Sequence, residues 1–265
     1  VRHGVEKLVT TLRTLHDICE PPEVIVYDDA GTMAEYKQIT DECAKYPTCK
    51  LVRGEKQVGC HGARQRLFEM ARGEFIASID GDMDFSRTAG DWYDVLSDAW
   101  IERGYGIMHP LLVWPRNEAG EDLVQSAGGN FFVNLENAAS GAAHRLDGLA
   151  ATDPVVQEAR KIEWGCGAFQ FFHQQLLEVV EMPGEGIYYP VYFGDVAFCF
   201  AARAAGFPVW HCPEVTVIHD ANTWCKSAEA ANPRIWIDSM KVFWERWRDM
   251  AEEGKRVRDE TGALP

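Results

Sequence analysis

This sequence of 265 residues has few basic side chains, no C-x-x-C pair and no low-complexity segment. Its 26 Lys and Arg residues stand against 41 Asp and Glu residues, a net charge of -15. An acidic surface repels phosphate backbones and anionic bilayers, which argues against nucleic acid as a partner. No run approaches the roughly 18 apolar residues of a membrane-spanning helix. The 46% hydrophobic content instead predicts a globular protein with a full core.

The 8 cysteines are scattered through a chain that is long enough to fold without disulfides. We therefore expect them to be reduced and mostly buried, which favours a cytoplasmic location. His211, Cys212, His219 and Cys225 match no spacing of a zinc site. No signal peptide is visible, but the first residue is not Met, so we expect an N-terminal piece to be missing.

Strand and helix patterns alternate through the first third of the chain. Helical spacing covers residues 4–18, 33–45 and 59–72, and short apolar runs cover 23–27, 50–53 and 74–79. This alternation predicts an α/β fold with a parallel sheet, in which ligands bind beyond the carboxyl ends of strands. Two acidic turns, Asp28-Asp29 and Asp80-Gly81-Asp82, stand at such ends.

The rest of the chain is less regular. We expect strands at 105–114, 130–134 and 208–218, a helix at 195–205, a mobile Ala- and Gly-rich loop at 138–152, and a helix from 227 to about 258. The last helix carries an apolar stripe formed by Trp236, Met240, Phe243, Trp244 and Trp247. Core packing is the favoured interpretation of this stripe. A homodimer interface or a peripheral membrane contact is an alternative, although mixed charges on the helix disfavour an anionic bilayer.

The turn after the third apolar run reads D-G-D-M-D, from Asp80 to Asp84. Two carboxylates two residues apart can converge on one hard cation, and Mg²⁺ and Mn²⁺ prefer oxygen ligands. Such an ion would neutralise charge on a diphosphate leaving group. A solvated acidic turn is the competing interpretation. His219, at the end of an apolar run, could complete the metal site or serve as a structural hydrogen-bonding residue.

The other acidic positions also allow two interpretations. Asp28 and Asp29 could accept hydrogen bonds from a nucleotide base or ribose, or could form an Asx turn or a helix N-cap. Asp195 stands at the start of a predicted helix. It could be a general base that takes a proton from an acceptor hydroxyl, or it could be an N-cap.

Five segments, in chain order, resemble family 2 glycosyltransferases of the GT-A fold. They are EVIVYDDAGT, GCHGARQRLFEMARGEFIASIDGDMD, GCGAFQFFHQQLLEVV, FGDVAFCFAARAAGFPVW and VTVIHD, and the likeness covers residues 5–222. The resemblance implies a Rossmann-like, mostly parallel sheet flanked by helices, with a smaller acceptor-side sheet. It also implies a nucleotide-sugar half at 1–110, an acceptor and catalytic-base half at 111–226 and a C-terminal aromatic helix at 227–265.

The same resemblance implies a role for each matched position. On the donor side it assigns Asp28, Asp29, Arg64, Asp80, Gly81 and Asp82. An acceptor-side loop would contain Trp164, Gly165, Cys166 and Gly167. Asp82, Asp80 and His219 would hold Mn²⁺ or Mg²⁺, and Asp195 would be the catalytic base of an inverting reaction.

The chain departs from the family pattern at several positions. Gly194 and Ala197 replace acidic residues, which changes the surroundings of Asp195. His173-Gln174 replaces a basic pair, and Gln65 replaces Asn. The family's first strand is also not present ahead of residues 4–18, so part of the nucleotide floor is expected to be missing.

The sequence thus predicts an inverting glycosyltransferase that moves a sugar from a nucleotide diphosphate donor to a hydroxyl of a saccharide or small molecule. UDP is the default donor nucleotide. A sugar nucleotidyltransferase is one alternative, although no Gly-rich basic phosphate loop is visible. A catalytically inactive nucleotide-sugar-binding module is the other, and donor hydrolysis or transfer would exclude it.

Overall fold

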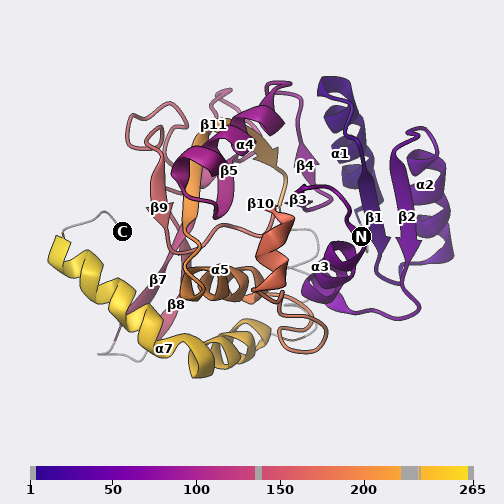
Figure 1. Cartoon of the computed structure of the whole chain (residues 1–265). Coiled ribbons are helices and arrows are strands. Elements are labelled where there is room, and N and C mark those ends of the chain that lie inside the picture. The colour runs from indigo at the N-terminus through magenta and orange to yellow at the C-terminus, as the bar shows by residue number, and fades with distance from the viewer. Residues whose placement is uncertain (1–3, 135–138, 222–231, 233, 262–265) are drawn as a thin grey trace.

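The computed structural model describes residues 4–134, 139–221, 232 and 234–261 (Figure 1). Its first elements are α1 (Val5–Ile18), β1 (Val24–Asp28), α2 (Met33–Cys43), β2 (Cys49–Arg53), α3 (Gly59–Met70) and β3 (Phe75–Ile79). Each lies within two residues of its predicted range. The start of α2 is fixed by a capping box, in which Thr32 and Glu35 bind each other's backbone N–H groups.

The second part of the chain adds short strands around one long one. Its elements are β4 (Met83–Asp84), α4 (Trp92–Arg103), β5 (Ile107–Val113), β6 (Val124–Ser126), β7 (Gly129–Asn134), β8 (Ala139–His144), β9 (Arg160–Ile162), β10 (Phe169–His173), η1 (Gln174–Glu178), α5 (Gly194–Ala204), β11 (Val209–His219) and α7 (Ile235–Thr261). The loop predicted at 138–152 was wrong over β8, because its Ala- and Gly-rich sequence pairs along the whole of β7. Residues 227–231 of the predicted C-terminal helix lie outside the described residues.

The central sheet contains both parallel and antiparallel strands. Its strand order is β3-β10-β5-β11-β4, with β6 beside β5 and β9 beside β11. Strands β5 and β11 run parallel, whereas β10 runs antiparallel to both of its neighbours. The parallel pair β1–β2 and the hairpin β7–β8 form separate small sheets. Among the described strands, direct parallel pairing occurs in β1–β2 and β5–β11, and β3 runs in the same direction as β5 because both are antiparallel to β10.

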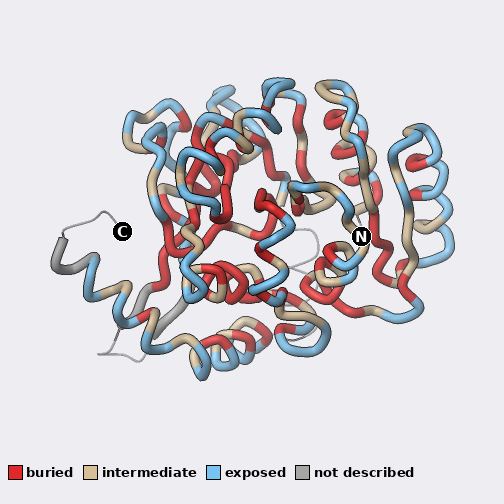
Figure 2. The backbone as a smooth tube through the Cα atoms, viewed as in Figure 1, coloured by how far each residue is buried: buried red, intermediate tan, exposed pale blue. Residues whose placement is uncertain are grey.

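The largest hydrophobic cluster joins β10, α5 and α7, and buried backbone runs through this region in Figure 2. Phe243 of α7 is 0% exposed and stacks on Phe131 at a ring separation of 4.8 Å. The other stripe residues, Trp236, Met240, Trp244 and Trp247, pack against the same cluster. Core packing of the aromatic stripe is therefore confirmed, and a dimer through α7 stays a prediction.

Two expectations about the whole chain bear on the site. Every cysteine in the described part of the chain is a free thiol; Cys225 lies outside it. Within the described residues, no helix combines the length and apolar character that membrane crossing requires. The division into halves near residue 110 stays a prediction.

Candidate active site

The acidic turn after β3 meets the end of β11. Strand β4 pairs antiparallel with β11 so that Met83 lies opposite His219, and the Asp220 N–H donates to the Asp82 carbonyl at 2.9 Å. As a result, ligand atoms of Asp80, Asp82 and His219 all lie within 4.8 Å of one another. The Nε2 atom of His219 is 3.3 Å from a carboxylate oxygen of Asp82. The structure thus brings together the three residues assigned to the metal.

Gln125 of β6 fixes the ring of His219. Its amide oxygen lies 2.5 Å from Nδ1 of His219, and its amide nitrogen donates to the His219 carbonyl at 3.2 Å. The Gln125 amide oxygen thus places Nδ1 to donate, and Nε2 faces the carboxylate of Asp82. Such an outer partner is typical of metal-binding histidines. Sequence reasoning missed Gln125, since an isolated glutamine in an irregular segment gives no signal.

Helix α1 holds the acidic turn in place. The hydroxyl of Thr11 donates to the Met83 carbonyl at 2.7 Å and accepts from the Met83 N–H at 3.0 Å. Thr14 accepts from the Phe85 N–H at 3.0 Å. The third carboxylate of D-G-D-M-D, Asp84, instead accepts from the Ser86 N–H at 2.8 Å. Asp84 is outside the Asp80–Asp82–His219 cluster, so only two of the three aspartates converge.

Arg64 of α3 links the acidic turn to the loop before β10. Its guanidinium donates to the Asp80 carboxylate and, at 2.8 Å, to the Gly167 carbonyl. Desolvation in the cavity raises the pKa of Asp80, and the charge of Asp82 adds to this, while Arg64 opposes it. A bound cation would favour the ionised form of Asp80 in the same way that Arg64 does.

Asp195 stands in the first turn of α5 and reaches the same loop. Its carboxylate accepts from the Gly167 N–H at 2.8 Å and from the Val196 N–H at 2.9 Å. A side chain at position 167 would collide, because a Cβ there would lie 2.9 Å from Cβ of Asp195. Gly167 therefore connects Asp195, through Arg64, to Asp80. The catalytic role of Asp195 stays a prediction.

The replacement of an acidic residue by Gly194 has a local cause. His61 of α3 is buried against the start of α5, and its Nε2 accepts from the Gly194 N–H at 3.3 Å. A Cβ on Gly194 would lie 2.3 Å from the His61 ring. Burial lowers the pKa of His61 to about 3, which keeps the ring neutral and able to accept. The ring of His61 thus occupies the space that the family's glutamate side chain would need.

The first acidic turn is occupied by contacts within the chain. The Asp28 carboxylate accepts from the Gly31 N–H at 2.9 Å and pairs with Arg53 at 2.6 Å, and it is 0% exposed. The Asp29 carboxylate accepts from the N–H groups of Val58 and Gly59 at 2.7 and 3.0 Å. Of the two aspartates, Asp29 lines the main cavity. Their contacts with a nucleotide stay predictions.

The loop from Trp164 to Gly167 borders the same cavity. Trp164 is buried, and Gly165 packs so closely on His109 that a Cβ would lie 2.8 Å from its ring. Burial raises the pKa of the Cys166 thiol well above its usual range. Cys166 is therefore a protonated, apolar part of the wall. An acceptor-binding role for this loop stays a prediction.

The residues assigned to the donor, the metal and proton transfer, except Asp28, open on one cavity of about 1040 Å³. Its polar wall includes Asp29, Arg64, Asp80, Gly81, Asp82, His144, Asp195 and His219. His211 is not placed to share a zinc ion with His219. The ring of His211 bonds the Val156 carbonyl at 3.0 Å, and His211 lies eight residues before His219 on β11. Among the described residues, Asp80, Asp82 and His219 form the one group that could hold a metal ion.

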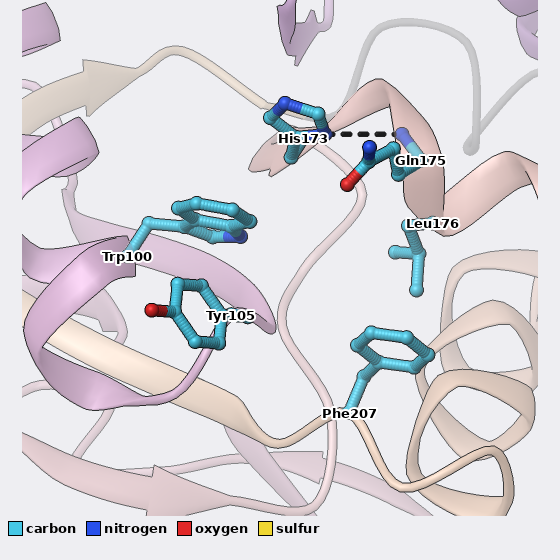
Figure 3. Close-up of a pocket in the computed structure, with 6 residues that line it drawn as sticks. All are labelled: Trp100, Tyr105, His173, Gln175, Leu176 and Phe207. Atoms are coloured by element: carbon cyan, nitrogen blue, oxygen red, sulfur yellow. Dashed lines mark hydrogen bonds between the residues drawn. The ribbon is translucent and has the colours of Figure 1, made fainter.

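A smaller pocket of about 330 Å³ lies at the opposite end of β3 (Figure 3). It is lined by Trp100, Tyr105, His173, Gln175, Leu176 and Phe207. His173 pairs with Phe75, the first residue of β3, whereas Asp80 follows the last. A five-residue strand spans about 16 Å. The position where the resemblance expects a basic pair is thus remote from the acidic turn.

Comparisons with known proteins agree with this geometry. Residues 4–89 match the model of glycosyl transferase family 2. No curated protein sequence matches the chain. Among solved structures, GalNAc-T7 with UDP, GalNAc and Mn²⁺ matches 97% of this chain at 16% identity and a TM-score of 0.60. A Pyrobaculum calidifontis mannosyltransferase with GDP-Man and Mn²⁺ matches all of it at 15% identity and a TM-score of 0.56.

The S. aureus protein TarS, in complex with UDP-GlcNAc, matches 85% of this chain at 15% identity and a TM-score of 0.53. This chain spans 49% of the GalNAc-T7 chain, 74% of the mannosyltransferase and 59% of TarS. The family match and these neighbours confirm the resemblance and the predicted α/β fold of the GT-A type.

Proposed function

We propose that this chain, whose residues 4–89 match the model of glycosyl transferase family 2, transfers a sugar from a nucleotide diphosphate to an acceptor hydroxyl with inversion at the anomeric carbon. The observation that carries the proposal is one shared cavity. It contains the Asp80–Asp82–His219 cluster and the carboxylate of Asp195, which Gly167 and Arg64 connect to Asp80. A nucleotide diphosphate and an acceptor bound in this cavity would meet between these groups.

Asp80, Asp82 and His219 would hold Mn²⁺ or Mg²⁺. Three electron-pair donors facing one point repel one another unless a cation lies between them, and the Gln125 hydrogen bond keeps Nε2 of His219 free to ligate. A bound divalent ion supplies positive charge that stabilises the diphosphate leaving group. Two structural neighbours, GalNAc-T7 and the Pyrobaculum calidifontis mannosyltransferase, were solved with Mn²⁺ and a nucleotide or nucleotide sugar, which supports the same choice here.

Asp195 would accept the proton of the acceptor hydroxyl. At the same time the hydroxyl oxygen would attack the anomeric carbon, and the bond from this carbon to the diphosphate would break. The hydrogen bond from Gly167 fixes the carboxylate at the cavity wall, and the loop Trp164–Gly167 would position the acceptor. Arg64 would act on the donor side through Asp80. Displacement in line with the leaving group gives inversion.

Asp29 and Gly81 would contact the nucleotide, because both line the cavity beside the metal ligands. Asp28 would act indirectly: its contacts with Gly31 and Arg53 shape the turn that presents Asp29. UDP is the first donor nucleotide to test, since two of the neighbours were solved with UDP or UDP-GlcNAc, and GDP is the second.

Calorimetry of UDP and GDP binding, with and without Mn²⁺, tests the proposal. We expect one nucleotide to bind only with Mn²⁺, and Asp82→Asn to remove this dependence. Asp84→Asn is the matched control, because it neutralises a carboxylate two residues away that is bonded to Ser86. Equal Mn²⁺-dependent binding by both variants would contradict the metal site.

Product analysis separates this activity from the two alternatives. Release of a nucleoside diphosphate from a nucleotide sugar supports transfer or donor hydrolysis. Release of pyrophosphate from a nucleoside triphosphate and a sugar phosphate would instead identify a nucleotidyltransferase. Tight binding of the nucleotide sugar with no turnover, across saccharide and small-molecule acceptors, would identify a binding module.

A further inference from the structure

Trp114 lies at the edge of the sheet that also carries the candidate metal ligands. Strand β5 runs parallel to β11 with Val113 opposite Ile218, so Trp114 follows the end of β5 beside His219, the last residue of β11. Strand β3, which leads into Asp80, points in the same direction. In such sheets ligands bind beyond the carboxyl ends of the strands. Trp114 is therefore placed at the ligand-binding edge, and it lines the main cavity.

A hydrogen bond holds the indole of Trp114 in one orientation. Its Nε1–H donates to Oδ1 of Asp147 at 3.0 Å, and both residues line the cavity. Trp114 is half-buried and Asp147 is exposed, so a ligand in the cavity can reach an apolar ring and a carboxylate side by side. The two oxygens of a carboxylate offer about four acceptor positions. Asp147 can therefore accept from a ligand as well as from the indole.

The turn that carries Asp147 is fixed to β6. The Gly148 N–H donates to the Val124 carbonyl at 2.8 Å, and the Val124 N–H donates to the Leu149 carbonyl at 2.8 Å. Leu146, just before Asp147, has a left-handed backbone with φ of 60°, which is uncommon for a residue other than glycine. Such conformations persist where the surrounding structure holds them, and they are concentrated at ligand sites. Asp147 is thus held in place before a ligand binds.

His144 of β8 belongs to the same part of the cavity wall. It is exposed to the cavity, its ring lies 5.0 Å from that of Trp164, and its Nδ1 is 2.9 Å from the hydroxyl of Ser126. Burial lowers the pKa of His144, and the charges of Asp195 and Asp147 oppose this shift. Both carboxylates are thus near the ring. Its Nε2 is available to a ligand hydroxyl, which can donate or accept.

The charges on the cavity wall bear on which ligand fits beside Trp114. Among the described residues that line the cavity, the Lys and Arg side chains are Lys7 and Arg64, and both are already paired with carboxylates. Asp147 and Asp195 add negative charge to the wall near His144. An anionic group there would be repelled. A neutral hydroxyl can instead donate to either carboxylate.

We propose that Trp114, Asp147 and His144 form the acceptor subsite of the cavity and select an uncharged sugar ring. The inference rests on the proposed function, because Asp195 would take the proton from a hydroxyl of this ring. The apolar C–H face of the sugar stacks on the indole, and its hydroxyls bond with Asp147 and His144. Acceptors that carry phosphate or carboxylate groups at this position bind more weakly.

The indole N–H signal of Trp114 in an NMR spectrum reports binding at this position. The signal that is lost in Trp114→Phe identifies it. The probes are methyl glycosides and disaccharides of the common hexoses, with the matching uronic acids and sugar phosphates, added in the presence of Mn²⁺ and UDP or GDP. We expect a neutral sugar to shift the signal and its charged counterparts to bind about tenfold more weakly. No shift with any neutral sugar, or tighter binding of the charged ones, would overturn the proposal.

Two variants test the contacts that the subsite would make. Trp114→Ala removes the stacking surface and should weaken sugar binding by about tenfold or more. Asp147→Asn keeps an oxygen for the indole N–H but loses the charge, and should weaken it by about tenfold. Leu149→Ala is the control, because Leu149 stands on the same turn, is 38% exposed and does not line the cavity. Equal sugar affinities of Trp114→Ala and Leu149→Ala would contradict the subsite.

Nucleotide binding separates this inference from the proposed function. Trp114→Ala should bind UDP or GDP with Mn²⁺ as tightly as the parent chain. If the nucleotide binds and no neutral sugar shifts the Trp114 signal, the subsite is wrong and sugar transfer still stands. If a sugar binds at Trp114 but no nucleotide binds with Mn²⁺, sugar transfer fails and the acceptor role fails with it. An equal loss of nucleotide-sugar affinity in Trp114→Ala would place the donor sugar there, which also overturns the proposal.

Discussion

At its carboxyl end β3 runs into Asp80 and Asp82, whereas at its amino end Phe75 packs among aromatic rings. Phe75 lies 5.1 Å from the ring of Trp100 and 5.2 Å from that of His173. The first end gathers carboxylates that repel one another, and the second gathers rings that attract one another. Both ends border a pocket, but the bonding around them differs in kind.

The two ends of β3 are expected to contribute differently to the stability of the folded chain. Like charges in one cavity destabilise the folded state unless a cation joins them, so under the proposed function the acidic end serves binding and not folding. The aromatic end is explained by packing alone. Substitutions at the acidic end should therefore change binding and turnover, and substitutions at the aromatic end should change the free energy of unfolding.

The largest effect is expected for Asp195→Asn. Loss of a general base lowers turnover by about 10²- to 10⁴-fold. Donor affinity with Mn²⁺ should stay nearly unchanged, because asparagine keeps an oxygen that can accept from Gly167 or Val196. Steady-state kinetics and calorimetry of the same preparation check both parts.

Asp153→Asn is the control for this variant. Asp153 also accepts from a backbone N–H two residues later, at 2.9 Å from Val155, and it does not line the cavity. Its turnover should match that of the parent chain. Near-normal turnover of Asp195→Asn would remove Asp195 from the mechanism and leave it as a helix-start residue.

The aromatic end should show the opposite pattern in Trp100→Ala. The indole stacks on His173 at 5.0 Å and meets Tyr105 at 4.7 Å, so its removal opens a void beside Phe75. We expect a loss of about 3 kcal/mol in the free energy of unfolding. Nucleotide binding should not change. Denaturant unfolding measures the first, and calorimetry the second.

Ile101→Ala is the control for Trp100→Ala, because the next residue on α4 is 56% exposed. An exposed substitution should change stability by less than about 0.5 kcal/mol. If Trp100→Ala weakened nucleotide binding more than it weakened folding, the two ends of β3 would be coupled, and the separation drawn here would be wrong.

The sequence predicted the carboxyl end of β3 better than the amino end. Asp80 and Asp82 follow an apolar run and His219 ends another, so strand ends alone brought them together. The Asp80–Asp82–His219 group was found for that reason. The contacts of Phe75 with Trp100 depend on how α4 packs on the sheet, and no local pattern in the sequence encodes that packing.

Contacts through the backbone were also beyond sequence reasoning. Gly167 joins Asp195 and Arg64 through its N–H and carbonyl groups, and a backbone atom carries no residue-specific signal. Strand β8 was missed because small residues give no alternation of apolar and polar positions. The antiparallel insertion of β10 between β3 and β5 joins segments about 60 to 100 residues apart, which periodicity cannot reveal.

A smaller effect, on metal affinity at the acidic end, is expected for Gln125→Ala. The glutamine is expected to act through His219, whose ring and carbonyl it bonds. Loss of such a partner typically lowers metal affinity by about 10- to 100-fold. Titration of Mn²⁺ in the presence of nucleotide measures it. Gln157→Ala, which removes a similar bond to the Ala151 carbonyl at 2.7 Å, should leave the affinity unchanged.

The two ends of β11 extend the comparison to pH. His219 faces carboxylates, whereas His211 is buried and its pKa is lowered to about 4 by desolvation. Between pH 6.5 and about 4 the unfolded chain binds a proton at His211 and the folded chain does not. Stability from this residue is thus complete above pH 6.5 and is lost as the pH falls, by about 1.4 kcal/mol per unit.

His211→Gln should lower the slope of the free energy of unfolding against pH by about 1.4 kcal/mol per unit. Stability at neutral pH should be largely kept, since glutamine retains an N–H donor for the Val156 carbonyl. Denaturant unfolding at pH 7, 6 and 5 gives the slope, and His16→Gln on α1 controls for the loss of an imidazole elsewhere. Both the parent chain and the variant should keep a further dependence of the free energy of unfolding on pH that comes from His61, whose pKa is lowered to about 3. An unchanged slope in His211→Gln would mean that His211 is protonated in the folded chain.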